Sequence, residues 1–172
     1  ITPTYSLYSS IKFINSKIET STESFQEIGL DAKINKKSDK RRLVIFVIGE
    51  TARRDHMSIN GYELKTNPYL EKEKIISFTN MTSCGTDTAW SVPCMFSLLD
   101  RSNYSHKKGK NMSNVLDLIS HAGANVIWLE NNSSSKSVAD RIIFKDYRTS
   151  KLNPKCNPEC RDEGMLINLQ DY

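Results

Sequence analysis

The sequence predicts an α/β fold with a mainly parallel central sheet flanked by helices. Two apolar runs, at residues 43–48 and 125–129, are dominated by aliphatic and aromatic side chains that do not alternate with polar ones. A strand with one face in water would alternate, so unbroken runs of this kind are typical of strands covered on both faces, as in a parallel sheet. The third observation is a helical pattern at residues 113–122, which lies between the two runs.

The chain begins with a polar segment, residues 1–40, that has no sustained hydrophobic period. We expect a linker there, with one short helix around residues 10–18. After the first apolar run, another strand is expected at residues 75–80. It leads into a loop and then into a helix that opens at Pro93, because proline is tolerated in the first turn of a helix, where its missing N–H has no partner.

Two further helices are expected in the second half of the chain. The first has Ser113 as its N-cap and stops at Gly123. The second starts near Arg161 or Asp162 and runs towards Gln170. The apolar stripe of the first helix consists of Val115, Leu116, Ile119 and Ala122.

Composition and charge limit the size of the fold and the classes of partner. A chain of 172 residues with 38% hydrophobic content can bury one ordinary core, so we expect a single domain or part of one. The net charge is +4, and the lysine-rich runs at residues 36–42 and 107–110 are typical of solvated loops. A mildly basic surface suits anionic phospholipid or lipopolysaccharide, and no basic stretch is interleaved with aromatic residues as in a nucleic-acid surface. No apolar run approaches the roughly 18 residues needed to span a bilayer, and no signal-peptide pattern occurs at Ile1.

The richest cluster of reactive side chains is the stretch 83–97, which contains two cysteines, several hydroxyl residues and a proline. Thr88 lies just before the expected helix start, near backbone N–H groups that have no partner. A helix N-terminus carries about half a positive charge and favours anions, so a hydroxyl held there is well placed to attack phosphate or sulfate. The alternative is a capping threonine in a Ser/Thr-rich loop.

A carboxylate, Glu50, stands at the end of the first apolar run, after Gly49. In open α/β sheets, ligands gather outside the carboxyl ends of the strands, which makes Glu50 a candidate metal ligand or general base. The alternative is a loop or helix-capping carboxylate that pairs with Arg53 or Arg54.

Another polar cluster follows the second apolar run, at residues 130–136. Asn132, Ser133 and Lys136 offer amide, hydroxyl and ammonium donors that could hold a phosphate. The alternative, and the commonest fate of such a string, is an Asx or Ser turn with a solvated lysine.

The four cysteines form two local pairs, Cys84 with Cys94 and Cys156 with Cys160. An even count at short separations favours disulfides in an oxidising compartment. Structural zinc is the alternative, although these separations without a C-x-x-C element fit a zinc knuckle poorly.

Five motifs follow one another along the chain. They are Gly-Glu-Thr-Ala-Arg at 49–53, Asn-Gly-Tyr at 60–62, Thr-Asn-Pro at 66–68, the segment from Cys-Gly-Thr to Met-Phe-Ser at 84–97, and Glu-Asn-Asn-Ser at 130–133. Together these motifs resemble the phosphoethanolamine transferases that modify lipid A and related envelope sugars in Gram-negative bacteria. The resemblance implies the sulfatase fold of the alkaline phosphatase superfamily. It also implies a zinc-dependent enzyme in which a threonine takes phosphoethanolamine from phosphatidylethanolamine and passes it to lipid A, lipooligosaccharide or another envelope acceptor.

The same resemblance implies roles for individual residues. Glu50 would be a zinc ligand, and Thr88 would be both a zinc ligand and the nucleophile. The segment with Asn132, Ser133 and Lys136 would face the donor phosphoethanolamine. Disulfides are expected in this family, and the one between the first two cysteines would brace the loop that presents the threonine.

The resemblance also predicts how the chain is organised. Residues 41–172 would form the N-terminal portion of the catalytic domain, about half of it, at the periplasmic face of the inner membrane. Residues 1–40 would link it to an absent membrane anchor. The Asp-His zinc ligands of the family would lie beyond Tyr172, because the pair Asp55-His56 is followed by Met-Ser rather than by Gly-Glu.

Two alternative functions follow from the same residues. One is a sulfatase or phosphodiesterase-type hydrolase of the same superfamily, since residues 91–94 are similar to the start of the sulfatase signature C/S-x-P-x-R; Met95, however, occupies the arginine position. The other is a non-catalytic periplasmic binding module that keeps the fold but lacks the full metal site.

Overall fold

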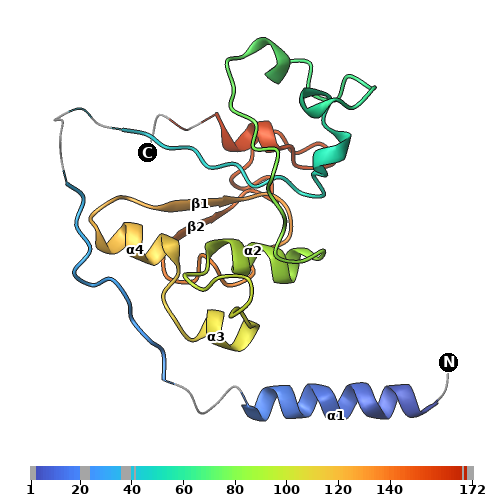
Figure 1. Ribbon diagram of the computed structural model, residues 1–172, viewed down its shortest axis with the longest axis vertical. Coiled ribbons are helices and arrows are strands. Elements are labelled where there is room, and N and C mark those ends of the chain that lie inside the picture. Colours follow the sequence, from blue (N-terminus) through green and yellow to red (C-terminus); the bar gives the residue numbers. More distant parts are fainter. Residues whose placement is uncertain (1–2, 20–23, 36–39, 41, 168, 170–172) are drawn as a thin grey trace.

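The computed structural model of the chain describes residues 3–19, 24–35, 40, 42–167 and 169 (Figure 1). The order of elements is helical in the first two thirds, and two strands follow near the end. The α-helices are α1 (Pro3–Glu19), α2 (Thr88–Phe96), α3 (His106–Lys110) and α4 (Val115–His121), the strands are β1 (Ile127–Glu130) and β2 (Ile143–Asp146), and the short 3-10 helices are η1 (Arg54–His56), η2 (Ser58–Asn60), η3 (Leu70–Lys72) and η4 (Asp162–Met165).

The sheet of the described residues consists of β1 and β2, which pair in parallel. The register places Ile127 opposite Ile143 and Glu130 opposite Asp146, so the two strands end at the same edge. The strand predicted at 125–129 and the parallel pairing are therefore confirmed.

The strands predicted at 43–48 and 75–80 are wrong for this structure. Both segments lack ladder hydrogen bonds, and their side chains are largely in water, with Val44 85% and Ile76 84% exposed. A sequence run predicts a buried strand only if other strands and layers cover it, and no described strand pairs with either segment. The first segment is nevertheless covered in part, because the ring of Phe46 lies 5.8 Å from that of Phe96 and Ile48 packs against the core.

Helix α2 begins at Thr88, so the predicted start at Pro93 is wrong. The carboxylate of Asp87 accepts the N–H of Trp90 at 3.0 Å and caps the helix earlier than the proline would. Pro93 consequently lies inside the helix. The threonine that the sequence placed in a loop is thus the first helical residue.

Helix α4 agrees with the sequence except at its cap. Asn114, not Ser113, is the N-cap, and it forms a capping box with Asp117. The Ser113 hydroxyl instead accepts the N–H of Ile28 at 3.0 Å. Gly123 follows the C-cap with φ +90°, a left-handed conformation that favours glycine, as expected for a helix end.

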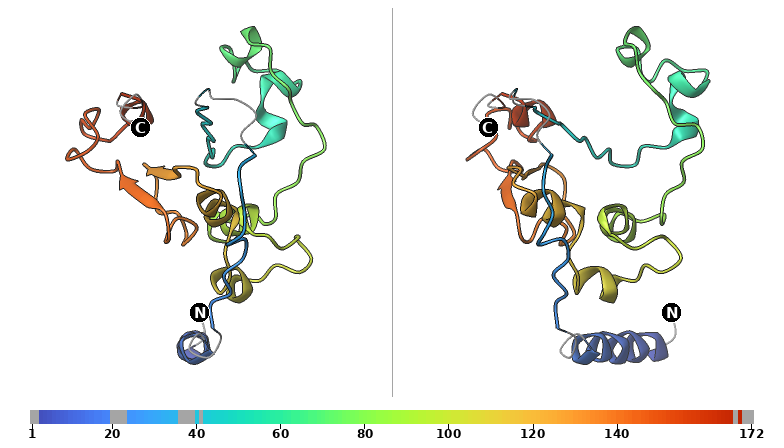
Figure 2. Two further views of the ribbon diagram at one scale, coloured as in Figure 1. Left: turned by 90° about the vertical axis from the view of Figure 1, so that its left-hand side faces the viewer. Right: turned by 60° about the vertical axis from the view of Figure 1, so that its left-hand side comes forward.

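Helix α1 is longer than the expected helix at 10–18 and stands apart from the other elements (Figures 1 and 2). The following segment returns to the body of the chain, where Gln26 bridges to Met112 and Phe25 stacks under the guanidinium of Arg141 at 4.5 Å. In the part of the chain that the structure describes, no helix combines the length and apolarity needed to cross a membrane.

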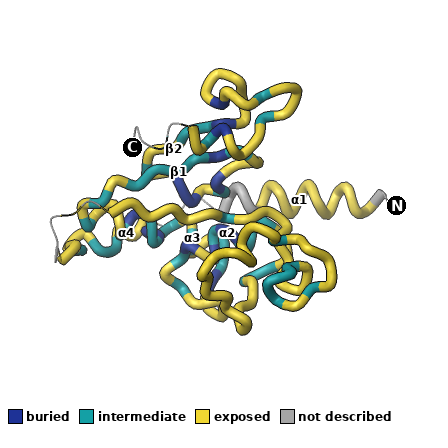
Figure 3. The backbone as a smooth tube through the Cα atoms, turned by 90° about the horizontal axis from the view of Figure 1, so that it is seen from above, coloured by how far each residue is buried: buried dark blue, intermediate teal, exposed yellow. Residues whose placement is uncertain are grey.

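The core is small and joins α2 to the sheet. Val92, Phe96 and Val138 are its buried members, and Trp128 of β1 packs against it with its ring 5.7 Å from that of Phe96. Figure 3 shows buried positions near α2, α4 and the strands, whereas residues 4–15 of α1 are exposed. This packing fixes the start of α2 relative to the loop that follows β1.

A polar hub organises the C-terminal segment. Asn153 is fully buried and donates to the carbonyl oxygens of Tyr147 at 2.9 Å and Arg161 at 3.0 Å. The final helix starts at Asp162 as predicted but is a single 3-10 turn that ends at Met165, and Gln170 lies outside the described residues.

We expect Gly164→Ala to destabilise the protein by roughly 1–3 kcal/mol, because a Cβ there would collide with the side-chain amide of Asn153, which has no room to move. Thermal unfolding measures the loss. Gly49→Ala is the control, since its Cβ would meet only the Ala52 Cβ at 3.2 Å. An unfolding midpoint for Gly164→Ala that is no lower than that of Gly49→Ala would contradict the packing described here.

Candidate active site

Side chains from three distant segments meet at one point. The Thr88 hydroxyl lies 3.3 Å from each carboxylate oxygen of Glu50. The side-chain amide of Asn132 donates to Oε2 of the same carboxylate at 2.8 Å. Glu50 ends the exposed apolar segment, Thr88 opens α2, and Asn132 follows β1, so the sequence-predicted residues from all three motifs share one contact.

The position of Thr88 excludes the capping role that the sequence left open. Asp87 caps the helix with its own carboxylate, so Thr88 is not the N-cap. Its hydroxyl points instead to Glu50, and the residue is half-buried. A hydroxyl that does not cap a helix and that faces a carboxylate can act as a nucleophile or as a metal ligand.

Glu50 is exposed, and hydroxyl and amide groups surround it. Thr51, whose φ of +53° is unusual for a threonine, donates its own hydroxyl to Oε1 at 3.0 Å. The alternative, pairing with Arg53 or Arg54, is not found among the described ion pairs. Arg53 pairs with Asp55 through Nη2 at 2.6 Å and holds the pKa of that carboxyl below its usual value. The carboxylate of Glu50 thus faces Thr88 and Asn132.

The pair Asp55-His56 stays outside this contact, as the sequence predicted. His56 lies 3.4 Å from Asp55 through Nδ1 and packs against the ring of Tyr62. Both belong to η1, in the segment of η1, η2 and η3 that projects away from the strands in Figure 2.

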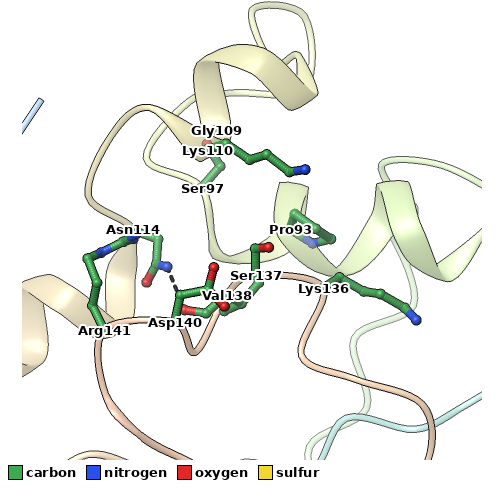
Figure 4. Close-up of a pocket in the computed structure, with 10 residues that line it drawn as sticks. All are labelled: Pro93, Ser97, Gly109, Lys110, Asn114, Lys136, Ser137, Val138, Asp140 and Arg141. Carbon is green, nitrogen blue, oxygen red and sulfur yellow. Dashed lines mark hydrogen bonds between the residues drawn. The ribbon is translucent and has the colours of Figure 1, made fainter. Parts of the chain in front are cut away.

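The other two predicted phosphate-binding residues lie on the same loop. The Lys136 ammonium donates to the Ser133 hydroxyl at 2.8 Å. Lys136 also borders a cavity of about 120 Å³ between the end of α2 and residues 136–141, but its ammonium points away from Ser137 and Asp140 (Figure 4). The structure thus joins Asn132 to Glu50 and leaves Ser133 and Lys136 joined to each other.

A buried carboxylate at the end of β1 organises this loop. Oε1 of Glu130 accepts the backbone N–H groups of Asn132 at 2.8 Å and Ser133 at 3.0 Å, and Oε2 accepts the indole N–H of Trp128 at 2.9 Å. The sequence placed Glu130 at the end of an apolar run, as the first residue of the 130–133 motif. Its burial could not be read from the sequence.

The end of β2 contributes a second group that the sequence did not predict. Arg148 donates to the carbonyl oxygen of Ser133 and forms an ion pair with Asp146. The hydrogen bonds from the guanidinium lower the pKa of Asp146 to about 2, so this carboxyl stays charged at neutral pH.

Two disulfides are present, Cys84–Cys94 and Cys156–Cys160, and no described cysteine is free. Structural zinc at these cysteines is therefore excluded. The first bridge links the loop before Thr88 to a buried position inside α2, so it holds the chain on both sides of the threonine.

One of the residues present fits a metal site. The Glu50 carboxylate is an oxygen ligand that zinc accepts, the Thr88 hydroxyl lies beside it, and the Asn132 amide holds the carboxylate as outer-shell partners of metal ligands do. Among the described residues no group of three or more His, Cys, Asp and Glu side chains could hold a metal ion. Glu50 and Thr88 would thus supply only part of a coordination shell.

Comparisons with known proteins find a matching family and similar sequences. The sequence model of the sulfatase family matches residues 42–172. The phosphatidylethanolamine transferase Mcr-1 of Escherichia coli is 49% identical over 141 residues, which cover 77% of this chain and 26% of that relative. The chain thus spans about a quarter of the length of this relative.

Solved structures agree with that match. The soluble domain of lipooligosaccharide phosphoethanolamine transferase A from Neisseria meningitidis has a TM-score of 0.80 at 35% identity, covering 88% of this chain and 46% of that one. The integral membrane protein lipooligosaccharide phosphoethanolamine transferase A from the same organism has a TM-score of 0.88 at 31% identity, covering 99% of this chain and 32% of that one.

A thiol assay should find both cysteine pairs oxidised to disulfides. We expect denatured, unreduced protein to show no reactive thiol and dithiothreitol-treated protein to show four, because all four cysteines are bridged. Reduction should also loosen the Thr88 loop and make it a site of proteolysis. Reactive thiols in natively purified, unreduced protein would contradict the assignment.

Proposed function

Since this chain belongs to the sulfatase family and, within it, to the phosphoethanolamine transferases, we propose that it serves to transfer phosphoethanolamine from phosphatidylethanolamine to lipid A, lipooligosaccharide or another envelope acceptor. The observation that carries this proposal is the contact of the Thr88 hydroxyl with the Glu50 carboxylate, beside the amide of Asn132. The relatives' names supply the group transferred and the donor; the chemistry follows from this chain's own residues.

The transfer takes place in two steps through a covalent intermediate on Thr88. The Thr88 oxygen attacks the phosphorus of the donor, the bond from phosphorus to the diacylglycerol oxygen breaks, and the threonine's proton ends on that leaving oxygen. The hydroxyl of the acceptor, on a sugar or on a protonated phosphate, then attacks the same phosphorus, the bond from phosphorus to the Thr88 oxygen breaks, and the acceptor's proton ends on Thr88. Each step exchanges one phosphorus–oxygen bond for another, so no oxidant or reductant is needed.

Zinc is the proposed cofactor, with Glu50 and Thr88 among its ligands. When bound, it would lower the pKa of the threonine hydroxyl and offset negative charge on the phosphoryl oxygens. Glu50 holds its carboxylate in place through hydrogen bonds from Thr51, at 3.0 Å, and Asn132, at 2.8 Å. Because these donors neutralise part of its charge and fix its direction, the carboxylate is oriented before any ligand arrives.

The loop after β1 would bind the donor. Asn132, Ser133 and Lys136 present an amide, a hydroxyl and an ammonium on one short segment that borders Glu50. These groups all donate hydrogen bonds, and the ammonium supplies a full positive charge, which matches the phosphate of the donor.

We further propose that the site works at the periplasmic face of the bacterial inner membrane. One relative in the comparisons is an integral membrane protein, and its match extends over 99% of this chain. Residues 41–172 would form the N-terminal portion of the catalytic domain, and residues 1–40 would connect it to a membrane anchor. Disulfides also suit the periplasm, which is oxidising.

Replacing Thr88 tests the proposed nucleophile in the full-length protein. Thr88→Ala should abolish both the phosphoethanolamine adduct and the transferred product, while far-UV circular dichroism and thermal unfolding change little. Thr88→Ser should keep some activity, because it retains the oxygen and loses only the methyl group that restricts its rotamer. Peptide mass spectrometry of protein incubated with donor and no acceptor locates the adduct.

Thr86 is the matched control. It carries the same hydroxyl two residues earlier, outside α2, so Thr86→Ala should retain the adduct. An adduct that maps to Thr86, Ser91 or Ser97 would show that the nucleophile is misassigned.

Zinc binding by the 172-residue chain should be weak, because Glu50 and Thr88 provide two ligands and catalytic zinc normally has at least three from the protein. Titration with elemental analysis measures this, and Glu50→Gln should weaken the residual binding further. Tight, stoichiometric zinc that is unaffected by Glu50→Gln would locate the metal elsewhere.

A further inference from the structure

The carboxylate of Glu130 makes only acceptor bonds, and it makes three of them. Two go to the backbone N–H groups of Asn132 and Ser133, at 2.8 and 3.0 Å, and one to the indole N–H of Trp128, at 2.9 Å. The residue is 6% exposed, so water contributes little to its solvation. A buried carboxylate is stable here because three N–H donors replace that water.

An acceptor-only group is required at this position. Oε1 already serves two backbone donors, and Oε2 serves the indole, so no oxygen is left without a donor. A glutamine of the same size could keep the bonds of Oε1 to the backbone, but its NH2 group would then face the indole N–H, donor against donor. The loop would shift rather than the indole, because Trp128 is packed in the core against Phe96.

Arg148 holds the same loop from the other side. Its guanidinium donates to the carbonyl oxygen of Ser133 while Asp146 holds the guanidinium in place. Glu130 and Asp146 are partners in the parallel ladder, so both acids stand at one edge of the sheet. The backbone of Ser133 is therefore fixed at its N–H by one strand end and at its carbonyl by the other.

From these contacts we propose that Glu130 is a positioning residue for phosphoryl transfer, a role that rests on the proposed function. It acts through the loop: by fixing the backbone of Asn132, it aims the side-chain amide at Glu50, 2.8 Å away. By fixing Ser133, it sets the hydroxyl that receives the ammonium of Lys136. The positions of the groups proposed to bind the donor phosphate thus depend on one buried carboxylate.

A set of three variants of the full-length protein tests this role: Glu130→Gln, Trp128→Phe and the two combined. Glu130→Gln should raise KM for phosphatidylethanolamine by on the order of tenfold or more, with a smaller change in kcat, because a misplaced loop binds the donor poorly. Trp128→Phe keeps an aromatic ring against Phe96 but leaves Oε2 without its donor, so it should raise KM by less than Glu130→Gln does, because both bonds from the loop backbone to Oε1 remain. The combined variant should recover most of the lost affinity, because the new amide no longer faces an indole N–H.

Hydrogen exchange of the Asn132 and Ser133 backbone amides gives a second readout that does not depend on turnover. Exchange should speed up in Glu130→Gln and slow again in the combined variant. Unchanged exchange and unchanged KM in Glu130→Gln would overturn the inference, and so would additive losses in the combined variant. If the unsubstituted protein forms no Thr88 adduct, the proposed function fails instead, and the exchange rates still decide whether Glu130 holds the loop.

Discussion

The site depends on one hydrogen-bonded contact, in which the Glu50 carboxylate meets the Thr88 hydroxyl and the Asn132 amide. The residues come from segments that are far apart in the sequence and of different kinds: an extended segment, a helix start and a loop after a strand. A single exposed carboxylate has little intrinsic preference for one direction. Its orientation comes from its donors, so the helix and the loop must be placed before the carboxylate can serve a metal or a nucleophile.

Packing and covalent bonds supply that placement. The edge-to-face contact of Phe96 with Trp128 fixes α2 against β1, and the Cys84–Cys94 bridge holds the approach to the helix. The buried carboxylate of Glu130, at the end of β1, then holds the following loop through hydrogen bonds from its backbone. Core packing and loop geometry are coupled here, because the indole that packs in the core also donates to the carboxylate that holds the loop.

The sequence predicted the members of the Glu50–Thr88 contact better than it predicted the sheet, and the chemical roles of these residues stay predictions. Glu50 and Thr88 were identified from what precedes and follows them, a buried-type run and a helix start, and the structure brings both side chains together. The run at 43–48 itself forms no strand, because pairing depends on partners that local patterning cannot reveal. The start of α2 was placed too late because the Pro93 rule is permissive, whereas the cap at Asp87 is an actual hydrogen bond. The burial of Glu130 could not be predicted, because burial is a tertiary property.

A crystal structure of the full-length protein trapped with phosphatidylethanolamine in the absence of acceptor tests the central claim most directly. The account predicts continuous electron density between the Thr88 oxygen and phosphorus, with the Glu50 carboxylate beside that oxygen and the 130–136 loop against the phosphoryl group. Density that joins phosphorus to another residue, or a Glu50 carboxylate turned away from Thr88 in the trapped protein, would contradict it.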